Sequence, residues 1–290
     1  MPQVEANGLR LEYDTFGNPA DPPLVLIMGL GAQMISWPEA FCQQYADQGF
    51  YVVRFDNRDC GLSTQLDDLP MPDLAAILGG DRGTVPYLMS DFANDTAGLF
   101  DALGFDRVHV VGASMGGMIA QQLVIDHPDR VLSLCSIMST TGDPSVGQGT
   151  PEALAMLTRP PATSRDEAIE QGIAALRLIS SPDYPTKDEV LRERATAAYD
   201  RANNPMGGMR QTAAIVASPD RTAGLHGVRV PTLVIHGTKD PLVDHSGGAA
   251  TAAAVPGSTF LSVPGMAHDL PEELWPTYVQ AIVANARKGD

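Results

Sequence analysis

The chain has 290 residues, of which 44% are hydrophobic, enough for the core of one sizeable domain with an insertion. Its formal net charge is −16, from 35 acidic and 19 basic residues. Such a surface repels phosphate backbones and anionic lipid headgroups, so we expect neither a nucleic acid nor a membrane among its partners.

The sequence also argues against a membrane span, a secretory signal and a metal site. It contains no run of 18 apolar residues, and its first residues lack a basic segment followed by an apolar stretch. Its three cysteines, Cys42, Cys60 and Cys135, form no spaced set and have no metal-ligand neighbours. We therefore expect a cytoplasmic protein with free thiols and no bound metal.

The first half of the chain alternates predicted strands and helices. Residues 4–16 alternate apolar and polar side chains around Asn7-Gly8, a pattern typical of a β-hairpin. Residues 64–88 are rich in Pro, Gly and Asp, which predicts a loop. Short apolar runs predict buried strands over 24–28, 51–55, 108–111 and 131–137, and helical spacing predicts helices over 37–47, from 90 or 91 to 103, and after 114.

The composition changes at Thr140. From there to Arg221 the sequence predicts only loops and helices, the helices over 150–157, 166–180, 187–201 and 209–217. Strands then return over 231–236 and 259–263, with helices over 248–254 and 272–287. This alternation predicts an α/β fold with a mostly parallel sheet and helices on both faces. We expect residues 1–140 and 223–290 to form this core and residues 141–222 to form a helical cap above it.

The functional interpretation depends on residues 112–116, Gly-Ala-Ser-Met-Gly. A β-branched run precedes them, and an apolar stripe at helical spacing follows from Ile119 onward. In a sharp turn from strand to helix, a serine is exposed at the apex and small residues on both sides make room for it. The N–H groups at the start of the helix favour negative charge there. We therefore predict that Ser114 is a nucleophile; a simple Gly-rich turn is the alternative.

A nucleophilic serine needs a base, and the base needs an orienting acid. Reactive residues of a parallel sheet gather at the carboxyl ends of its strands. Asp240 and His268 each follow a late predicted strand, and the order Ser114, Asp240, His268 is the order expected for this arrangement. Asp143, which follows the strand over 131–137, is the alternative acid. The remaining histidines lie in predicted strands, at a helix end or in surface loops: His109, His127, His226, His236 and His245.

The intermediate formed at the serine also needs an oxyanion site with two N–H donors. One donor is expected from the residue after the nucleophile, which is Met115. The other is expected from the loop after the first long buried strand. We predict the N–H of Leu30 for this role, with Gly29 and Gly31 as alternatives.

These motifs resemble those of the α/β-hydrolase superfamily. The resemblance covers nearly the whole chain and is carried by residues 28–31, 56–63, 112–117, 237–243 and 265–268. Within the superfamily, Met28-Gly29 and Trp37-Pro38 resemble aclacinomycin methylesterase-type esterases, which remove a methyl group from an ester. Many relatives have His-Gly in place of Met28-Gly29, and Arg-Gly-x-Gly in place of residues 58–61.

The resemblance implies an α/β-hydrolase fold that needs no cofactor. A serine at the turn implies an esterase that cleaves carboxylic esters of small to medium apolar molecules through an acyl-enzyme. A carbon–carbon bond hydrolase or a perhydrolase on the same triad is the alternative activity. A ligand-binding receptor with slow turnover is the alternative of another class. The sequence leaves open whether the protein is a monomer or a homodimer.

Methionines are frequent around the predicted site. Methionine adapts to irregular apolar shapes, so as a group these side chains predict an apolar pocket, although ordinary core packing explains any single one. The predicted pocket residues are Met28, Gly29, Met34, Trp37, Met138, Met206, Met209 and Met266.

Overall fold

Strand β3 (Pro23–Ile27) shows how the central sheet divides the apolar side chains between two cores. Leu24 and Leu26 belong to one cluster of buried side chains, whereas Val25 and Ile27 belong to another. Successive side chains leave a strand on opposite faces, so this continuous apolar run is buried on both sides. The computed structural model describes residues 2–289.

The sheet has eight strands in the order β1-β2-β4-β3-β5-β6-β7-β8. The hairpin β1–β2 is antiparallel, β2 is antiparallel to β4, and all the other pairs are parallel. The bounds of the other strands are β1 (Gln3–Ala6), β2 (Leu9–Phe16), β4 (Tyr51–Phe55), β5 (Val108–Ala113), β6 (Val131–Ile137), β7 (Thr232–Gly237) and β8 (Thr259–Val263).

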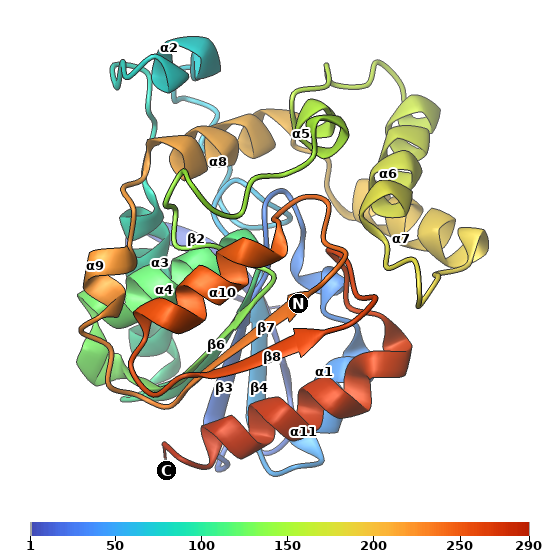
Figure 1. Cartoon of the computed structure of the whole chain (residues 1–290). Helices are drawn as coiled ribbons and strands as arrows, with labels where there is room; N and C mark the ends of the chain where they lie inside the picture. The colour runs from blue at the N-terminus through green and yellow to red at the C-terminus, as the bar shows by residue number, and fades with distance from the viewer. Residues whose placement is uncertain (1, 290) are drawn as a thin grey trace.

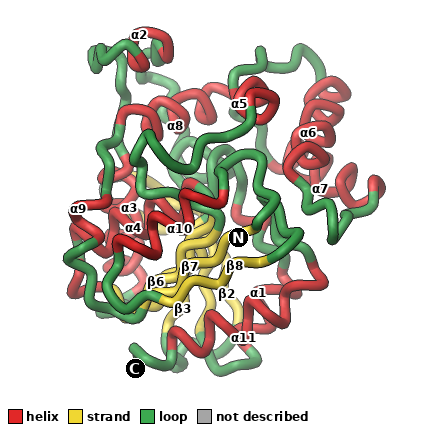
Figure 2. Tube along the Cα trace, in the orientation of Figure 1, coloured by secondary structure: helices red, strands yellow, loops and turns green. Residues whose placement is uncertain are grey.

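Helices cover both faces of the sheet (Figures 1 and 2). One face packs against α3 (Met89–Leu103), α4 (Met115–Asp126) and the end of α10 (His245–Ala254). The other packs against α1 (Glu39–Ala46) and α11 (Trp275–Ala286). The predicted α/β architecture, a mostly parallel sheet between two helical layers, is confirmed.

Residues 141–222 leave this core between β6 and β7, and we call them the inserted segment. They contain α5 (Pro151–Leu157), α6 (Arg165–Ile179), α7 (Asp188–Arg201) and α8 (Pro205–Ala217), which lie above the sheet in Figure 1. The two ends of the segment lie side by side, because the Arg221 N–H donates to the carbonyl of Thr141 at 2.9 Å. The segment can therefore be inserted without disturbing the order of the strands.

The structure contains two helices that were not predicted and lengthens a predicted one. The loop expected over 64–88 contains α2 (Leu74–Leu78), whose Asp73 side chain accepts from the Ala76 N–H. Helix α8 begins at Pro205, four residues before the predicted start, because Asn204 caps it and Pro205 occupies its first turn. Helix α9 (Thr222–Leu225) was not predicted. Helices as short as α2 and α9 give no readable periodicity in the sequence.

None of the helices among residues 2–289 is long and apolar enough to cross a membrane.

The core beneath α1 and α11 yields a stability prediction. Phe41 has no exposed surface and packs against Tyr45 and Trp275, with ring centroids 5.0 and 5.1 Å apart. Phe41→Ala is expected to lower the free energy of unfolding by about 3–5 kcal/mol, measured by urea denaturation, because it leaves a cavity in this cluster. Leu78→Ala is the control, since Leu78 is 73% exposed; a loss of similar size there would contradict the argument.

Candidate active site

Ser114 lies at the turn between β5 and α4, in a backbone conformation that non-glycine residues rarely adopt, with φ 57° and ψ −122°. Such a conformation costs about 1–3 kcal/mol and persists only where its surroundings hold it. Here the Ser114 N–H donates to the carbonyl of Ile137, and the Ser114 carbonyl accepts from the Gly117 N–H, both at 2.9 Å. The side chain is therefore presented at the carboxyl edge of the sheet.

The glycines around this turn are required by close backbone contacts. A Cβ at Gly112 would lie 2.1 Å from the carbonyl oxygen of Gly116, and a Cβ at Gly116 would lie 2.1 Å from that of Ile27. A Cβ at Gly29 would lie 2.9 Å from the Ser114 Cβ. The start of α4 and the loop after β3 thus approach the serine more closely than any side chain would allow.

Three predicted site residues meet at this edge. His268 Nε2 lies 2.9 Å from Ser114 Oγ, and His268 Nδ1 lies 2.7 Å from Asp240 Oδ2. An ionised carboxylate only accepts hydrogen bonds, so this pairing assigns the imidazole proton to Nδ1 and leaves Nε2 free to accept the serine proton.

The surroundings of Asp240 keep its carboxylate ionised. Burial is the largest single influence and by itself would raise its pKa, but the charge of His268 and hydrogen bonds from His236 and His268 outweigh it. The backbone N–H groups of Leu242 and Val243 also donate to Oδ1, each at 2.9 Å. The pKa of Asp240 is therefore well below its usual range.

The predicted oxyanion donors flank this serine. Among residues 2–289, no hydrogen bond uses the N–H of Leu30 or of Met115. The neighbouring N–H of Gly31, by contrast, donates to Gln211 Oε1 at 2.8 Å. The alternative donor Gly31 is therefore already engaged, whereas Leu30 and Met115 retain their capacity to bind a ligand oxygen.

Comparison with known proteins identifies the family of this chain. Residues 22–273 match the family described as alpha/beta hydrolase fold. The chain belongs to this family. It is 28% identical to the rhodomycin D methylesterase DauP of Streptomyces sp. (strain C5), over 98% of this chain and 97% of that protein. It is also 28% identical to the rhodomycin D methylesterase DnrP of Streptomyces peucetius, over 96% and 95%.

The solved structures agree with this membership at the level of the fold. The meta-cleavage product hydrolase CumD of Pseudomonas fluorescens IP01 superposes with a TM-score of 0.77 at 17% identity, over 100% of this chain and 98% of that chain. The resemblance predicted from the sequence motifs is confirmed by these findings.

Within this hydrolase fold, the predicted methionine and tryptophan pocket residues fall into three groups by burial. Met34, Trp37 and Met266 have no exposed surface, so in this structure they present no face to a ligand. Met28 and Met138 are buried at 6% and 5% exposure in the same apolar cluster as Trp37. Met206 and Met209, near the start of α8, are half-buried, and their role in a pocket stays a prediction.

Asp143, the alternative acid, does not pair with His268, whose Nδ1 is bonded to Asp240. Asp143 accepts hydrogen bonds from the N–H and hydroxyl of Ser145, at 2.8 and 2.7 Å, and these bonds lower its pKa. His236 is fully buried beside Asp240, where its Nε2 donates to the carbonyl of Val243 at 2.8 Å. It supports the loop that carries the acid.

No sequence pattern predicted the contacts that hold the histidine loop. The His268 N–H donates to the carbonyl of Ile179 at 3.0 Å, and the Ala267 N–H donates to Ser181 Oγ at 2.8 Å. The Ser181 hydroxyl in turn donates to Asp269, whose pKa is raised by burial. Because Ile179 and Ser181 come from the inserted segment, only the folded chain brings them here.

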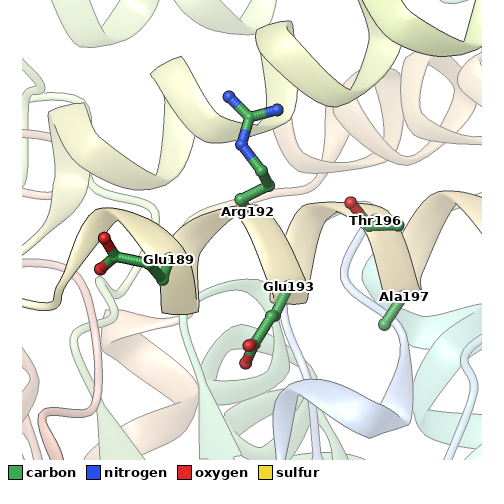
Figure 3. Close-up of a pocket in the computed structure, with 5 residues that line it drawn as sticks. All are labelled: Glu189, Arg192, Glu193, Thr196 and Ala197. Atoms are coloured by element: carbon green, nitrogen blue, oxygen red, sulfur yellow. The ribbon is translucent and has the colours of Figure 1, made fainter.

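Figure 3 shows a concavity on the surface of α7. It is lined by Glu189, Arg192, Glu193, Thr196 and Ala197, and contains none of the three residues joined at Ser114. Within residues 2–289, the structure has no group of three or more His, Cys, Asp or Glu side chains able to hold a metal ion.

The close contacts at the serine turn lead to a prediction. Gly116→Ala is expected to destabilise the protein by more than about 1 kcal/mol, seen as a lower Tm, because the new Cβ collides with the backbone of β3. Gly208→Ala is the control, since a Cβ there meets nothing within 4 Å. A methyl group at this position inside α8 should stabilise the helix by about 0.5–1 kcal/mol. Equal effects at both positions would contradict the steric argument.

Proposed function

We propose that this protein is a serine hydrolase that cleaves carboxylic esters of small to medium apolar molecules through an acyl-enzyme. The observation that carries the proposal is the continuous pair of hydrogen bonds from Ser114 through His268 to Asp240. The 28% identity to two methylesterases over nearly the whole chain supports an ester as the substrate.

In the first half of the reaction, Ser114 Oγ attacks the ester carbonyl carbon while His268 Nε2 takes the hydroxyl proton. Asp240 stabilises the resulting imidazolium. The carbonyl oxygen becomes an oxyanion, to which the N–H groups of Leu30 and Met115 donate. When the tetrahedral intermediate collapses, His268 returns the proton to the leaving oxygen, and the alcohol departs from an acyl-Ser114.

The second half repeats these steps with water. His268 Nε2 takes a proton from water, the hydroxide attacks the acyl carbon, and the same two N–H groups stabilise the second oxyanion. Collapse of this intermediate returns the proton to Ser114 Oγ and releases the carboxylic acid. No step requires an oxidant, a metal or a cofactor.

The proposal assigns residues 1–140 and 223–290 to the catalytic core and residues 141–222 to a cap that covers it. The contact between Arg221 and Thr141 supports these boundaries, because the segment leaves and rejoins the core at one place. A cover over Ser114 excludes water and strengthens the hydrogen bonds to the oxyanion. Met206 and Met209 are the cap side chains proposed to contact the apolar part of the ester.

We also propose the cytoplasm as the compartment. Cys42, Cys60 and Cys135 are all free and buried, as is usual for thiols kept reduced. Burial raises the pKa of Cys42 to about 12, so this thiol stays protonated and unreactive.

Removal of the nucleophile tests the proposed function. Ser114→Ala is expected to lower kcat for p-nitrophenyl acetate by about 10⁴-fold or more, because the attacking oxygen is lost. Circular dichroism checks that the variant is folded. A folded variant with near-normal turnover would overturn the assignment, and a wild-type protein that binds but does not turn over esters would favour the receptor.

Substitutions at two aspartates test which residue is the acid that orients His268. Asp240→Asn is expected to lower kcat by about 10⁴-fold, because an amide at this position holds His268 in the wrong tautomer. Asp143→Asn is the matched control and should stay within about twofold of the wild type, since within residues 2–289 the Asp143 carboxylate accepts hydrogen bonds from Ser145 alone. If Asp143→Asn were the more damaging change, the acid would have to be reassigned.

A further inference from the structure

Gln211 on α8 connects the inserted segment to the loop that carries Leu30. Its side chain has no exposed surface. Its Oε1 accepts from the Gly31 N–H at 2.8 Å, and its Nε2 donates to the carbonyl of Arg58 at 2.7 Å. Both ends of the amide are therefore used, one on each of two core loops.

The Leu30 N–H belongs to the peptide unit between Gly29 and Leu30. This unit is held mainly through the peptide units before and after it. On one side, the Met28 carbonyl accepts from Asn57 Nδ2 at 2.9 Å. On the other side, the Gly31 N–H is held by Gln211. Among residues 2–289, the unit itself makes a single long hydrogen bond, from the Ala32 N–H to the Gly29 carbonyl at 3.3 Å. The direction of the Leu30 N–H thus depends on the two side chains that fix the adjacent peptides.

Nothing in the local backbone replaces the Gln211 contact. Gly31 has φ +63°, and a Cβ there would meet nothing within 4 Å. A glycine in open space rotates readily, so without a partner for its N–H the peptide between Leu30 and Gly31 has several accessible orientations. The amide of Gln211 selects one of them.

We propose that Gln211 is a positioning residue that aims the Leu30 N–H at the oxyanion. This inference rests on the proposed ester hydrolysis and extends it: the inserted segment covers the site and also completes the oxyanion apparatus. A donor that is already oriented costs no reorganisation when the oxyanion forms, which is why its loss acts on the chemical step.

The side chain at position 211 can be changed without releasing α8 from the core. The neighbouring Arg210 donates from Nε and Nη2 to the two carboxylate oxygens of Asp59, at 2.8 and 2.7 Å. Tyr87 also donates to Asp59, at 2.7 Å. This buried pair keeps the helix docked, so a substitution at Gln211 leaves the rest of the interface in place.

The test compares Gln211→Ala with Gln211→Met, which fills a similar space but cannot hydrogen-bond. Both are expected to lower kcat for p-nitrophenyl acetate by about 10- to 100-fold, less than the roughly 10²- to 10³-fold cost of removing a donor outright. KM should change by less than about threefold, because the ground-state ester makes little use of the oxyanion site. Phenylboronic acid, which forms a tetrahedral adduct with the serine, should bind more weakly by the same factor as kcat falls.

Asn285→Ala is the matched control for losing a buried side-chain amide. Asn285 donates to the carbonyls of Leu134 and Pro231, away from the oxyanion loop. It should lower Tm about as much as Gln211→Ala but leave kcat and boronate affinity within about twofold of the wild type. An equal loss of kcat in this control would mean that Gln211 acts only through stability.

Two failures are distinguishable. If the wild type neither hydrolyses the ester nor reacts with a fluorophosphonate at Ser114, the proposed function fails. If the wild type is active and both Gln211 variants keep kcat within about twofold, the positioning role of Gln211 is overturned and the proposed function stands.

Discussion

The close approach of α4 to the sheet is the constraint on which the rest of this site depends. Gly112 and Gly116 leave no room for a side chain, since a Cβ added to either would lie 2.1 Å from a backbone carbonyl oxygen. This contact holds Ser114 in its strained conformation and brings the start of α4 against the loop after β3. The nucleophile and the proposed oxyanion donors are therefore positioned by one packing arrangement.

The parallel sheet is the second feature that brings the site residues together. Residues Ala113 of β5 and Ile137 of β6 are paired, as are Gly237 of β7 and Val263 of β8, so these strands end at one edge. The loops that follow them carry the serine, the acid and the histidine. Residues more than 100 positions apart in the chain meet there because parallel strands all end on the same side.

The inserted segment takes part in this arrangement from both sides. Its Ile179 and Ser181 hold the backbone around His268, and its Gln211 holds the loop of Leu30. Arg201 adds an ion pair to buried Asp56, whose carboxylate also accepts from the Met34 N–H, each at 2.7 Å. The inserted segment is thus hydrogen-bonded both to the loop of His268 and to the loop of Leu30.

The sequence by itself determined the strands, the serine turn and the order of nucleophile, acid and histidine, because these follow from local patterns and from the edge rule for parallel sheets. Local patterns also located the inserted segment by its lack of strands. They did not separate Trp37 and Met266, which are fully buried, from residues that face a ligand, since burial depends on distant neighbours. The hydrogen bonds of Ser181 and Gln211 were decided only by the tertiary structure, because a single buried hydrogen bond leaves no periodic trace in the sequence.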